Sequence, residues 1–387
     1  MPKAYRPLSS KVSNMSKIAV IFGTRPELIK LSPVVNALRQ RIGDDAISTY
    51  STGQHRELLA QAQLCLDTPI DVNFDVMTHA QLTSDVLAKT VTLLEAEFAQ
   101  KRPELVVVQG DTMTAFAGAM ASFLNKIPLV HVEAGLRTLD QENPWPEEGL
   151  RQMIARVTTL HLAPTPGART NLMREGIPSE KIHVVGNPGI DTLVALRNAP
   201  KSPAKEKSSL TKGRTKLVLI TMHRREAFDG GLDHFCDELQ KTLRMHSNCM
   251  FIWPLHPNPA VREVVRKHFS DDEEFPNLCL TEPFPYEEMI SVLPLADLVI
   301  SDSGGMQEEA PYCGVPIIVV RDITERPEII ELGLGHIAGS RALDLSEHVS
   351  GFLDTPLDPN AIDTWQKLQG QGRSSVQIAE LLANLIS

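Results

Sequence analysis

"LADLVISDSGGMQEEAP", which spans Leu295–Pro311, contains one complete unit of the fold that this chain is expected to adopt. An apolar run ends at Ile300, a small-residue turn with two adjacent glycines follows, and the residues after the glycines suit a helix. A buried strand, a tight turn and a helix in this order are typical of α/β proteins with a parallel sheet. The turn also offers backbone N–H groups at a helix N-terminus, which is a common way to bind an anion.

The same unit recurs along the chain. Further apolar runs that suit buried strands lie at residues 17–22, 104–109, 128–133, 216–221, 248–255 and 316–320. Because these runs are apolar on both faces, they predict parallel strands that are covered by helices on both sides. Helical patterns follow two of the runs, at residues 26–41 and 111–125. This order predicts an α/β fold with two Rossmann-like, doubly wound parallel sheets.

A basic segment separates the two halves of this series. Arg197–Lys216 holds seven basic residues and one acidic residue, which predicts a solvated loop at a domain junction. We therefore expect an N-terminal domain over residues 17–190 and a C-terminal nucleotide-binding domain over residues 191–364, with a ligand cleft between them. Residues 365–387 are expected to form a helix that packs back on the N-terminal domain, and residues 1–16 a disordered leader.

Composition narrows the range of partners. The 387 residues carry a formal net charge of −10, which argues against nucleic-acid binding and against attraction to anionic membranes. Five scattered cysteines without a C-x-x-C pair fit a reducing cytosol. No apolar run reaches the roughly 18 residues of a membrane helix, so we expect a cytoplasmic protein. His223 and His256 lack the spacing of a metal site, and no metal is expected.

"IFGTRPELIK" (Ile21–Lys30) follows the first predicted strand. Gly23 permits a tight turn, and Pro26 suits the first position of a helix. The helix N-terminus attracts anions, and Arg25 adds a fork-shaped donor beside it. The alternative is a surface arginine next to a helix that starts with proline. The spacing matches neither a P-loop nor a dinucleotide-binding fingerprint.

Carboxylates follow several strands of the first half. Asp111 lies just past one strand, where it suits either a helix cap or a catalytic role, and Glu133 closes the next strand. Burying a carboxylate at a strand end costs several kcal/mol unless it is paired, so Glu133 is the harder one to explain structurally. "PWPEEGLRQM" then supplies Glu147, Glu148 and Arg151, and we expect one of the two glutamates to be merely solvated. Carboxylates that converge raise one another's pKa, which suits proton transfer.

The second half offers groups that suit a nucleotide. His223 and two arginines follow a strand directly, which favours an anion site, and His256 follows the next strand. The small turn of the opening stretch suits a phosphate, and the glutamates one helical turn later suit a ribose diol. The alternative is that Glu308 and Glu309 only complement the helix dipole. Further polar candidates after the next strand are Arg321, Thr324 and Arg326.

Taken in order, these motifs resemble those of the non-hydrolysing UDP-N-acetylglucosamine 2-epimerases. The resemblance covers residues 17–333 and rests on GTRPE-x-IK, TGQH, GDT, HVEAGLRT, PWPEE, HRRE, HPNP and SDSGG-x-QEEAP with TERPE. It implies two Rossmann-like domains arranged as in glycogen-phosphorylase-type glycosyltransferases, no metal or cofactor, and a homodimer. It also implies a UDP-sugar substrate and a role in cell-surface polysaccharide biosynthesis.

The matching positions imply roles for individual residues. Proton transfer or sugar positioning is implied for Asp111, Glu133 and Glu147, with His223 near the sugar and the diphosphate. Diphosphate binding is implied for Arg25, Ser303, Gly304 and Gly305, and ribose binding for Glu309. Further substrate-binding candidates are Lys30, Arg151 and His256. In some relatives a second, activating UDP-sugar binds at the element that here contains Gln54 and His55.

The implied reaction removes UDP across C1–C2 of the sugar to leave a 2-acetamidoglucal, and then adds UDP back with the C2 proton on the other face. The chain departs from the family pattern at Leu150, where asparagine is usual, at Gly189, and at Ala227. Four alternatives therefore stay open: a 2-epimerase of a modified UDP-sugar such as a diacetamido uronic acid, a hydrolysing 2-epimerase, a glycosyltransferase of the same architecture, and a non-catalytic UDP-sugar sensor.

Overall fold

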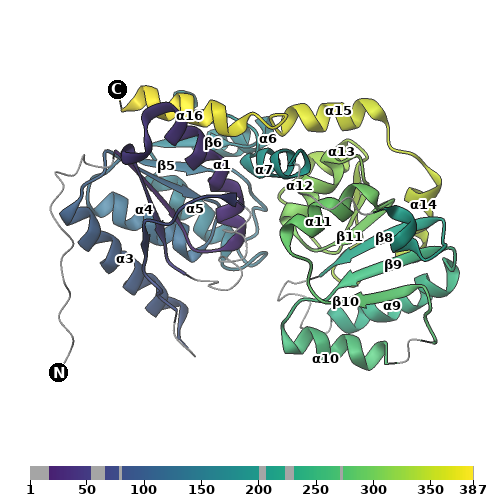
Figure 1. Ribbon diagram of the computed structural model, residues 1–387. Coiled ribbons are helices and arrows are strands. Elements are labelled where there is room, and N and C mark those ends of the chain that lie inside the picture. The colour runs from purple at the N-terminus through teal and green to yellow at the C-terminus, as the bar shows by residue number, and fades with distance from the viewer. Residues whose placement is uncertain are drawn as a thin grey trace.

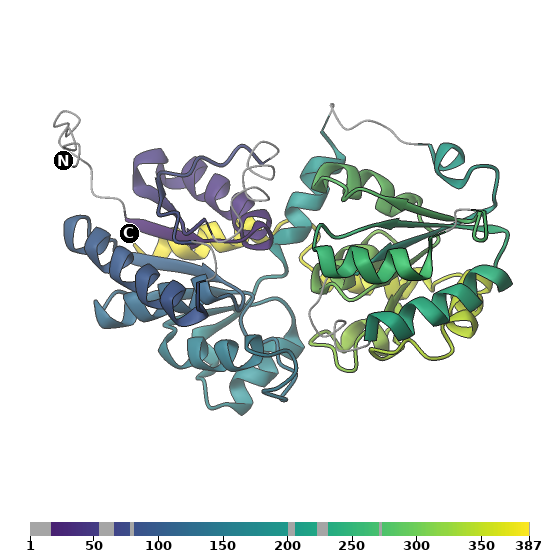
Figure 2. The same ribbon diagram turned by 90° about the horizontal axis from the view of Figure 1, so that it is seen from below.

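The structure is a computed structural model that describes residues 17–53, 66–77, 81–199, 206–222, 231–270 and 273–386. Two parallel β-sheets lie side by side, and helices cover the faces of each sheet (Figures 1 and 2). This arrangement confirms the predicted fold class of two doubly wound α/β domains. The predicted leader, residues 1–16, lies outside the described residues.

The first sheet has seven parallel strands in the order β3-β2-β1-β4-β5-β6-β7. Their bounds are β1 (Ile18–Phe22), β2 (Ile47–Ser51), β3 (Val72–Asn73), β4 (Leu105–Gln109), β5 (Leu129–Val132), β6 (Leu160–Ala163) and β7 (Ile182–Val184). The helices of this domain are α1 (Arg25–Ile42), α3 (Thr83–Gln100), α4 (Met113–Leu124), α5 (Glu147–Val157) and α6 (Pro166–Arg174).

Alternate residues of β1 divide the core of this domain into two layers. Ile18, Val20 and Phe22 share one apolar cluster with α1 and the C-terminal helix α16 (Ser374–Leu385). Ala19 and Ile21 instead share a cluster with α3, α4 and α5. All five side chains are fully buried, because a central strand of a doubly wound sheet has helices on both faces.

The second sheet has six parallel strands in the order β10-β9-β8-β11-β12-β13. Their bounds are β8 (Lys216–Thr221), β9 (Cys249–Pro254), β10 (Leu278–Thr281), β11 (Leu298–Ser301), β12 (Ile317–Val319) and β13 (Gly335–Ile337). The helices that follow its strands are α9 (Gly231–Met245), α10 (Pro259–His268), α11 (Tyr286–Val292), α12 (Gly304–Tyr312), α13 (Glu328–Glu331) and α14 (Leu345–Asp354). The apolar clusters of α9 and α14 and of α11 and α12 fill its two sides.

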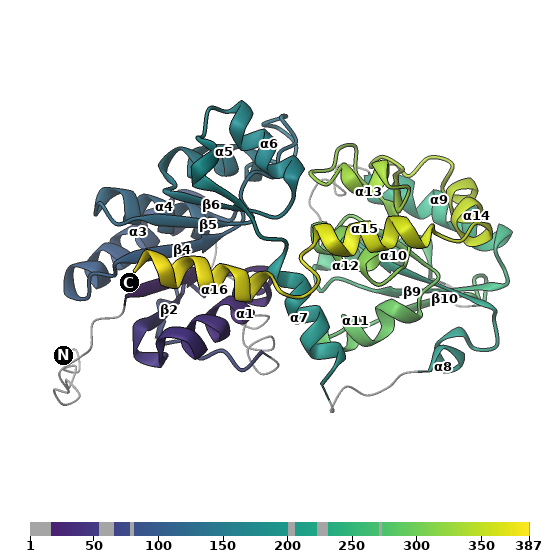
Figure 3. The ribbon, with the colours of Figure 1, turned by 90° about the horizontal axis from the view of Figure 1, so that it is seen from above.

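Two crossings of the chain join the domains. α7 (Pro188–Arg197) packs against α1 of the first domain and against α11 and α12 of the second. α15 (Pro359–Leu368) lies on the second domain, and α16 returns to α1 of the first (Figure 3). Asp191 of α7 fixes this return, because its carboxylate accepts the backbone N–H of Ser374 at 3.2 Å and that of Ser375 at 2.6 Å.

The segment 197–216 was predicted to be a solvated loop, and nearly all of its described residues from 206 to 216 are exposed or half-buried, but they do not all form a loop. It contains the short helix α8 (Lys207–Thr211). Lys207 pairs with Asp297 Oδ2 at 2.5 Å, and the same oxygen accepts the backbone N–H of Leu217 at 2.8 Å. A basic side chain that looked solvated therefore anchors the start of β8.

The longest helices of the described ranges, α1 and α3, have 18 residues each, and both carry charged side chains. Among the helices that the structure describes, none combines the length and the apolar character that crossing a membrane requires.

Candidate active site

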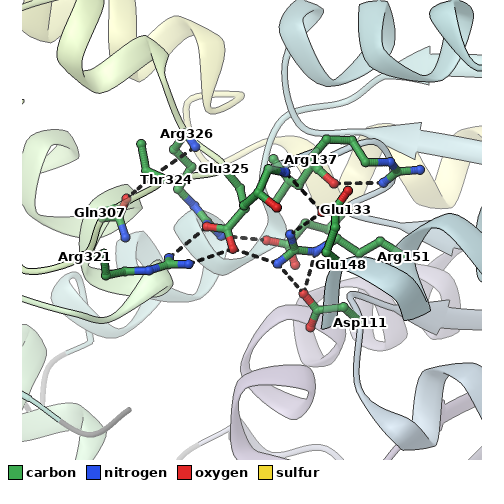
Figure 4. Close-up of polar contacts among 12 residues, drawn as sticks. Asp111, Glu133, Arg137, Glu148, Arg151, Gln307, Arg321, Thr324, Glu325 and Arg326 are labelled. Atoms are coloured by element: carbon green, nitrogen blue, oxygen red, sulfur yellow. Dashed lines mark hydrogen bonds and ion pairs between the residues drawn. The ribbon is translucent and has the colours of Figure 1, made fainter. Parts of the chain in front are cut away.

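Charged side chains from both domains meet where the carboxyl ends of the two sheets face each other (Figure 4). Three cross-domain ion pairs hold this region together: Lys30–Glu308 at 3.0 Å, Arg326–Glu133 at 3.3 Å and Arg151–Glu325 at 2.9 Å. The partners from the N-terminal half are Lys30 of α1, Glu133 directly after β5, and Arg151 of α5. The network therefore builds one site from both halves of the chain.

The β1–α1 turn is held by a buried glutamate that the sequence analysis did not assign. One oxygen of Glu27 accepts the backbone N–H groups of Gly23 at 2.9 Å and Thr24 at 2.8 Å, while Thr24 Oγ1 also donates to it at 2.8 Å. Its other oxygen accepts Thr112 Oγ1–H at 2.6 Å. Burial raises the pKa of Glu27 despite these donors. Since Thr112 follows Asp111, Glu27 ties the turn with Arg25 to the turn with Asp111.

Arg25 begins α1 and lies close to acidic groups of the second domain. Burial lowers its pKa, and the nearby Glu309 and Tyr286 act in the opposite direction. Tyr286 donates its hydroxyl to Glu309 Oε1 at 2.7 Å. Burial raises the pKa of Glu309 to about 7. This carboxyl can therefore exchange a proton near neutral pH.

Glu133 follows β5 in a left-handed backbone conformation, with φ at +65°. A residue other than glycine in this region is uncommon and often marks a functional position. Its carboxylate accepts from Lys30 Nζ at 2.5 Å and Arg326 at 3.3 Å, and also from the Gln109 amide. Burial raises the pKa of Glu133, and the charge of Lys30 offsets only part of that effect. The carboxyl group is therefore harder to ionise than that of an exposed glutamate.

Glu308 is the counterpart of Glu133 on the second domain. Arg326 contacts it at 2.5 Å, Lys30 at 3.0 Å, and the Asn187 amide donates to it at 2.7 Å. Burial alone would raise the pKa of Glu308, but Arg326 and Lys30 outweigh it and lower the pKa to about 2. Glu308 thus stays ionised. Its contacts go well beyond the helix-dipole role that the sequence left open.

Asp111 belongs to a second part of the network, around Arg151 of α5. The Arg151 guanidinium contacts Asp111 Oδ2 at 2.7 Å, Glu148 Oε2 at 3.2 Å and Glu325 Oε1 at 2.9 Å. Figure 4 shows this guanidinium between Asp111 and Glu325. Arg321 reaches the Glu325 carboxylate from the other side, at 2.9 and 3.1 Å. Two carboxylates of one domain and one of the other therefore share a single cation.

The N-terminus of α12 has the predicted form. Ser303 is its N-cap residue, and its side chain makes no capping hydrogen bond. Gly304 and Gly305 form the first two helical positions, so backbone N–H groups remain available to an anion. A Cβ atom on Gly304 would lie 3.1 Å from Arg326 Nη1, so a glycine lets the turn approach that guanidinium closely.

The remaining candidates have different outcomes. Glu147 begins α5 and is half-buried, one turn before Arg151. Glu148 is fully buried, and it accepts the backbone N–H of Thr138 at 3.1 Å as well as contacting Arg151. Glu148 is therefore not a merely solvated glutamate, and Glu147 is the more exposed of the two. His256 is half-buried in the β9–α10 turn, where its Nδ1 accepts the backbone N–H of Asn258 at 3.2 Å. His223, Gln54 and His55 lie outside the described residues.

The fold and this site define a class of protein: a two-domain α/β enzyme of the GT-B-like type, with acids and cations gathered between its Rossmann-like domains. The sequence model of the UDP-N-acetylglucosamine 2-epimerases matches residues 41–383. The chain belongs to this family. The resemblance that its motifs carried is thereby confirmed.

Individual relatives agree with that assignment. The chain is 35% identical to the UDP-N-acetylglucosamine 2-epimerase of Yersinia pestis, over 95% of this chain and 98% of the relative. The crystal structure of the enzyme from Neisseria meningitidis bound to UDP-GlcNAc matches with a TM-score of 0.86 and 32% identity, covering 95% of this chain and 99% of that one. The enzyme of Methanocaldococcus jannaschii, in complex with UDP-GlcNAc and UDP, matches with a TM-score of 0.82 and 30% identity, again over 95% and 99%.

Proposed function

We propose that this chain interconverts UDP-N-acetylglucosamine and UDP-N-acetylmannosamine. The observation that carries the proposal is Glu133, a buried carboxylate with a raised pKa between Lys30 and Arg326, at the meeting point of the two domains. The bound UDP-GlcNAc in the related Neisseria meningitidis structure supports the choice of substrate. The proposed roles of single residues are those that the family resemblance implies, and the contacts described above support them for Asp111, Glu133 and Arg151.

The mechanism follows from the chemistry of the substrate. The C2 proton is not acidic, since that carbon is not next to a carbonyl. In the proposed route a carboxylate takes this proton while the C1–O bond breaks, which yields 2-acetamidoglucal and UDP. UDP then re-forms the bond to C1, and C2 receives a proton on the opposite face. Asp111, Glu133 and Glu147 would transfer protons or position the sugar, with His223 near the reacting atoms.

The nucleotide would be held mainly by the second domain. The turn at Ser303, Gly304 and Gly305 would bind the diphosphate together with Arg25, because helix N-termini and arginines stabilise departing negative charge. Glu309 would bind the ribose. Further substrate contacts are proposed for Lys30, Arg151 and His256.

We further propose a homodimer in the cytoplasm that serves cell-surface polysaccharide biosynthesis, with no metal or cofactor in the reaction. We propose domains at residues 17–190 and 191–364, so that one boundary falls within α7 and the other within α15, and the part of residues 365–387 that forms α16 packs back on the first domain. A second UDP-sugar would bind near Gln54 and His55.

A single assay tests the reaction. The protein is incubated with UDP-GlcNAc in D2O, and the products are followed by NMR. UDP-ManNAc with deuterium at C2 is the expected product. Free N-acetylmannosamine would instead indicate a hydrolase, and acceptor-dependent release of UDP a glycosyltransferase. If only a modified UDP-sugar is turned over, that sugar is the substrate. If no UDP-sugar is turned over, the protein is a non-catalytic UDP-sugar sensor.

A variant tests the assigned acid/base group. Glu133→Gln should lower kcat at least about 100-fold, as expected for loss of a general acid or base. Its Kd for UDP should stay within about threefold of the wild-type value, because the proposed nucleotide contacts lie mostly on the second domain. The matched control is Glu142→Gln, an exposed glutamate before α5, which should keep normal turnover. Near-normal turnover of Glu133→Gln would contradict the role.

A further inference from the structure

Glu325 lies in the loop between β12 and α13, and nothing in the proposed reaction requires it to touch the substrate. Its side chain is fully buried. It forms ion pairs with Arg321 at 2.9 Å and Arg326 at 3.2 Å in its own domain, and with Arg151 of the other domain at 2.9 Å. Burial alone would raise the pKa of Glu325, but the three arginines hold it well below its usual range. Glu325 is therefore a permanent anion at the domain interface.

The charges on the two sides of this interface are complementary. On the N-terminal side, Arg151 shares its single positive charge between Asp111 and Glu148, which leaves a net negative charge. On the C-terminal side, Glu325 lies between Arg321 and Arg326, and Arg326 also pairs with Glu308 at 2.5 Å. The opposite charges that meet across the interface are those of the pairs Arg326–Glu133 and Lys30–Glu308 as well as Arg151–Glu325. When the domains come together, the Arg151–Glu325 pair joins the two halves. Complementary charges of this kind fix the register of an interface.

The domains must separate for a substrate to enter. The side chains of Glu133 and Glu308 are only 8% and 5% exposed, and cross-domain ion pairs surround both. A UDP-sugar can reach Glu133 only if those pairs part and re-form around it. The Arg151–Glu325 pair is therefore made and broken in each cycle, whereas the contacts of Arg151 with Asp111 and Glu148 remain within one domain.

We propose that Glu325 is a positioning residue that couples domain closure to the orientation of Asp111 through Arg151. On closure its carboxylate binds Arg151 Nη2, the same nitrogen that contacts Asp111 Oδ2 at 2.7 Å. Arg151 Nε also donates to Asp111 Oδ2 at 2.7 Å, so a guanidinium fixed from the far side fixes the Asp111 carboxylate as well. Asp111 then reaches its working geometry only in the closed enzyme. This inference rests on the proposed function, in which Asp111 serves the reacting sugar.

The same contacts also fit a purely structural role, in which Glu325 only balances Arg321 and Arg326. The two roles differ in what happens when Asp111 is removed. If Glu325 acts through Asp111, its loss has no further effect on kcat in a protein that already lacks the Asp111 carboxylate. If its role is structural, its loss lowers kcat by the same factor in both backgrounds, as independent effects do.

The experiment is a double-mutant cycle with Glu325→Gln and Asp111→Asn, measured as kcat in the UDP-GlcNAc assay. We expect Glu325→Gln to lower kcat at least about 10-fold in the wild-type background, since small misplacements of a catalytic group are costly. In the Asp111→Asn background the further loss should stay below about twofold. An equal loss in both backgrounds would overturn the proposal, as would a wild-type-like kcat for Glu325→Gln.

A control variant tests whether the loss of any buried glutamate–arginine pair has the same effect. Glu175 binds Arg137 through two contacts, at 2.6 and 3.2 Å, within the first domain alone. Glu175→Gln should keep kcat within about threefold of the wild type, and an equal loss in this variant would overturn the proposal. If Glu325→Gln does not fold, Glu325→Asp replaces it, because the shorter side chain keeps the charge and withdraws from Arg151.

A second readout does not depend on activity. Small-angle X-ray scattering with saturating UDP should give a larger radius of gyration for Glu325→Gln than for the wild type, with Glu175→Gln like the wild type. Equal radii for all three proteins would contradict the link to closure. If the wild type does not turn over UDP-GlcNAc, the proposed function fails, and the scattering result still decides whether Glu325 holds the domains closed.

Discussion

Replacing Gly23 by alanine would place a methyl group where the β1–α1 turn has no room for one. A Cβ atom at Gly23 would lie 2.0 Å from Thr52 Oγ1 and 2.3 Å from Thr114 Oγ1. Both threonines are buried, and their hydroxyls are hydrogen-bonded to each other at 2.8 Å. Neither hydroxyl can rotate away into solvent. Gly23→Ala must therefore shift the turn or separate the two threonines.

The expected loss of stability combines two effects. Forcing an extra methyl group into a packed core costs about 1–3 kcal/mol. Separating the Thr52–Thr114 hydrogen bond inside the protein costs about 1 kcal/mol more. The free energy of unfolding should therefore fall by about 2–4 kcal/mol, a large part of the roughly 5–15 kcal/mol that stabilises a typical domain. Because Arg25 follows two residues later, KM for the UDP-sugar should rise as well.

Urea denaturation of the wild type and the variant measures this loss directly. The matched control is Gly149→Ala in α5, because a Cβ atom at Gly149 meets no other atom within 4 Å. That substitution should raise the free energy of unfolding by about 0.5–1 kcal/mol, since alanine favours a helix. A Gly23→Ala protein within about 0.5 kcal/mol of the wild type would refute the reasoning, because it would mean that the turn relaxes without resistance.

Two further predictions concern groups outside the reacting centre. Because burial raises the pKa of Glu309 to about 7 from an ordinary 4.5, its contribution to stability is fully present below pH 4.5 and is lost as pH rises through 7. Between pH 4.5 and 7 the free energy of unfolding of the ligand-free wild type should therefore decrease by about 3 kcal/mol through this group, and Glu309→Gln should lack that decrease. If urea denaturation shows the same pH dependence for both proteins, the prediction is contradicted. Asp191→Ala removes the acceptor for two backbone N–H groups at the start of α16. It should lower the free energy of unfolding by about 2 kcal/mol and speed amide hydrogen exchange in that helix. Unchanged hydrogen exchange in α16 would show that Asp191 does not hold the start of this helix.

Strands with helices on both faces could be predicted from the sequence. β1, β4 and β8 lie inside the apolar runs at residues 17–22, 104–109 and 216–221, because nearly every position in them is buried. β10 was missed, since its four residues are only half-buried and its apolar run is only three residues long. β6 was also missed, because His161 interrupts it with a polar side chain that is nevertheless fully buried.

A site residue could be predicted from the sequence where its position at the end of a strand was enough to single it out. Glu133 stood out because it closes an apolar strand, and the structure places it in the cross-domain network. The sequence did not distinguish Glu147 from Glu148, because the two are equally acidic and only packing shows that Glu148 is the buried one. The available signal was the spacing of Glu148 and Arg151, three residues apart on one helix, which suits an ion pair.

Charge balance explains why Glu325 belongs to the site although no motif selected it. A fully buried carboxylate costs several kcal/mol unless cations surround it, and Glu325 has Arg321 and Arg326 in its own loop and Arg151 in the other domain. Arg321 lies four residues away in the sequence, but Arg151 is 174 residues away and becomes a neighbour only because the carboxyl ends of both sheets face each other. The arginines of the two domains thus form one electrostatic unit around Glu325. The membership of Glu325 in the site therefore becomes visible only when the two halves of the chain are placed together.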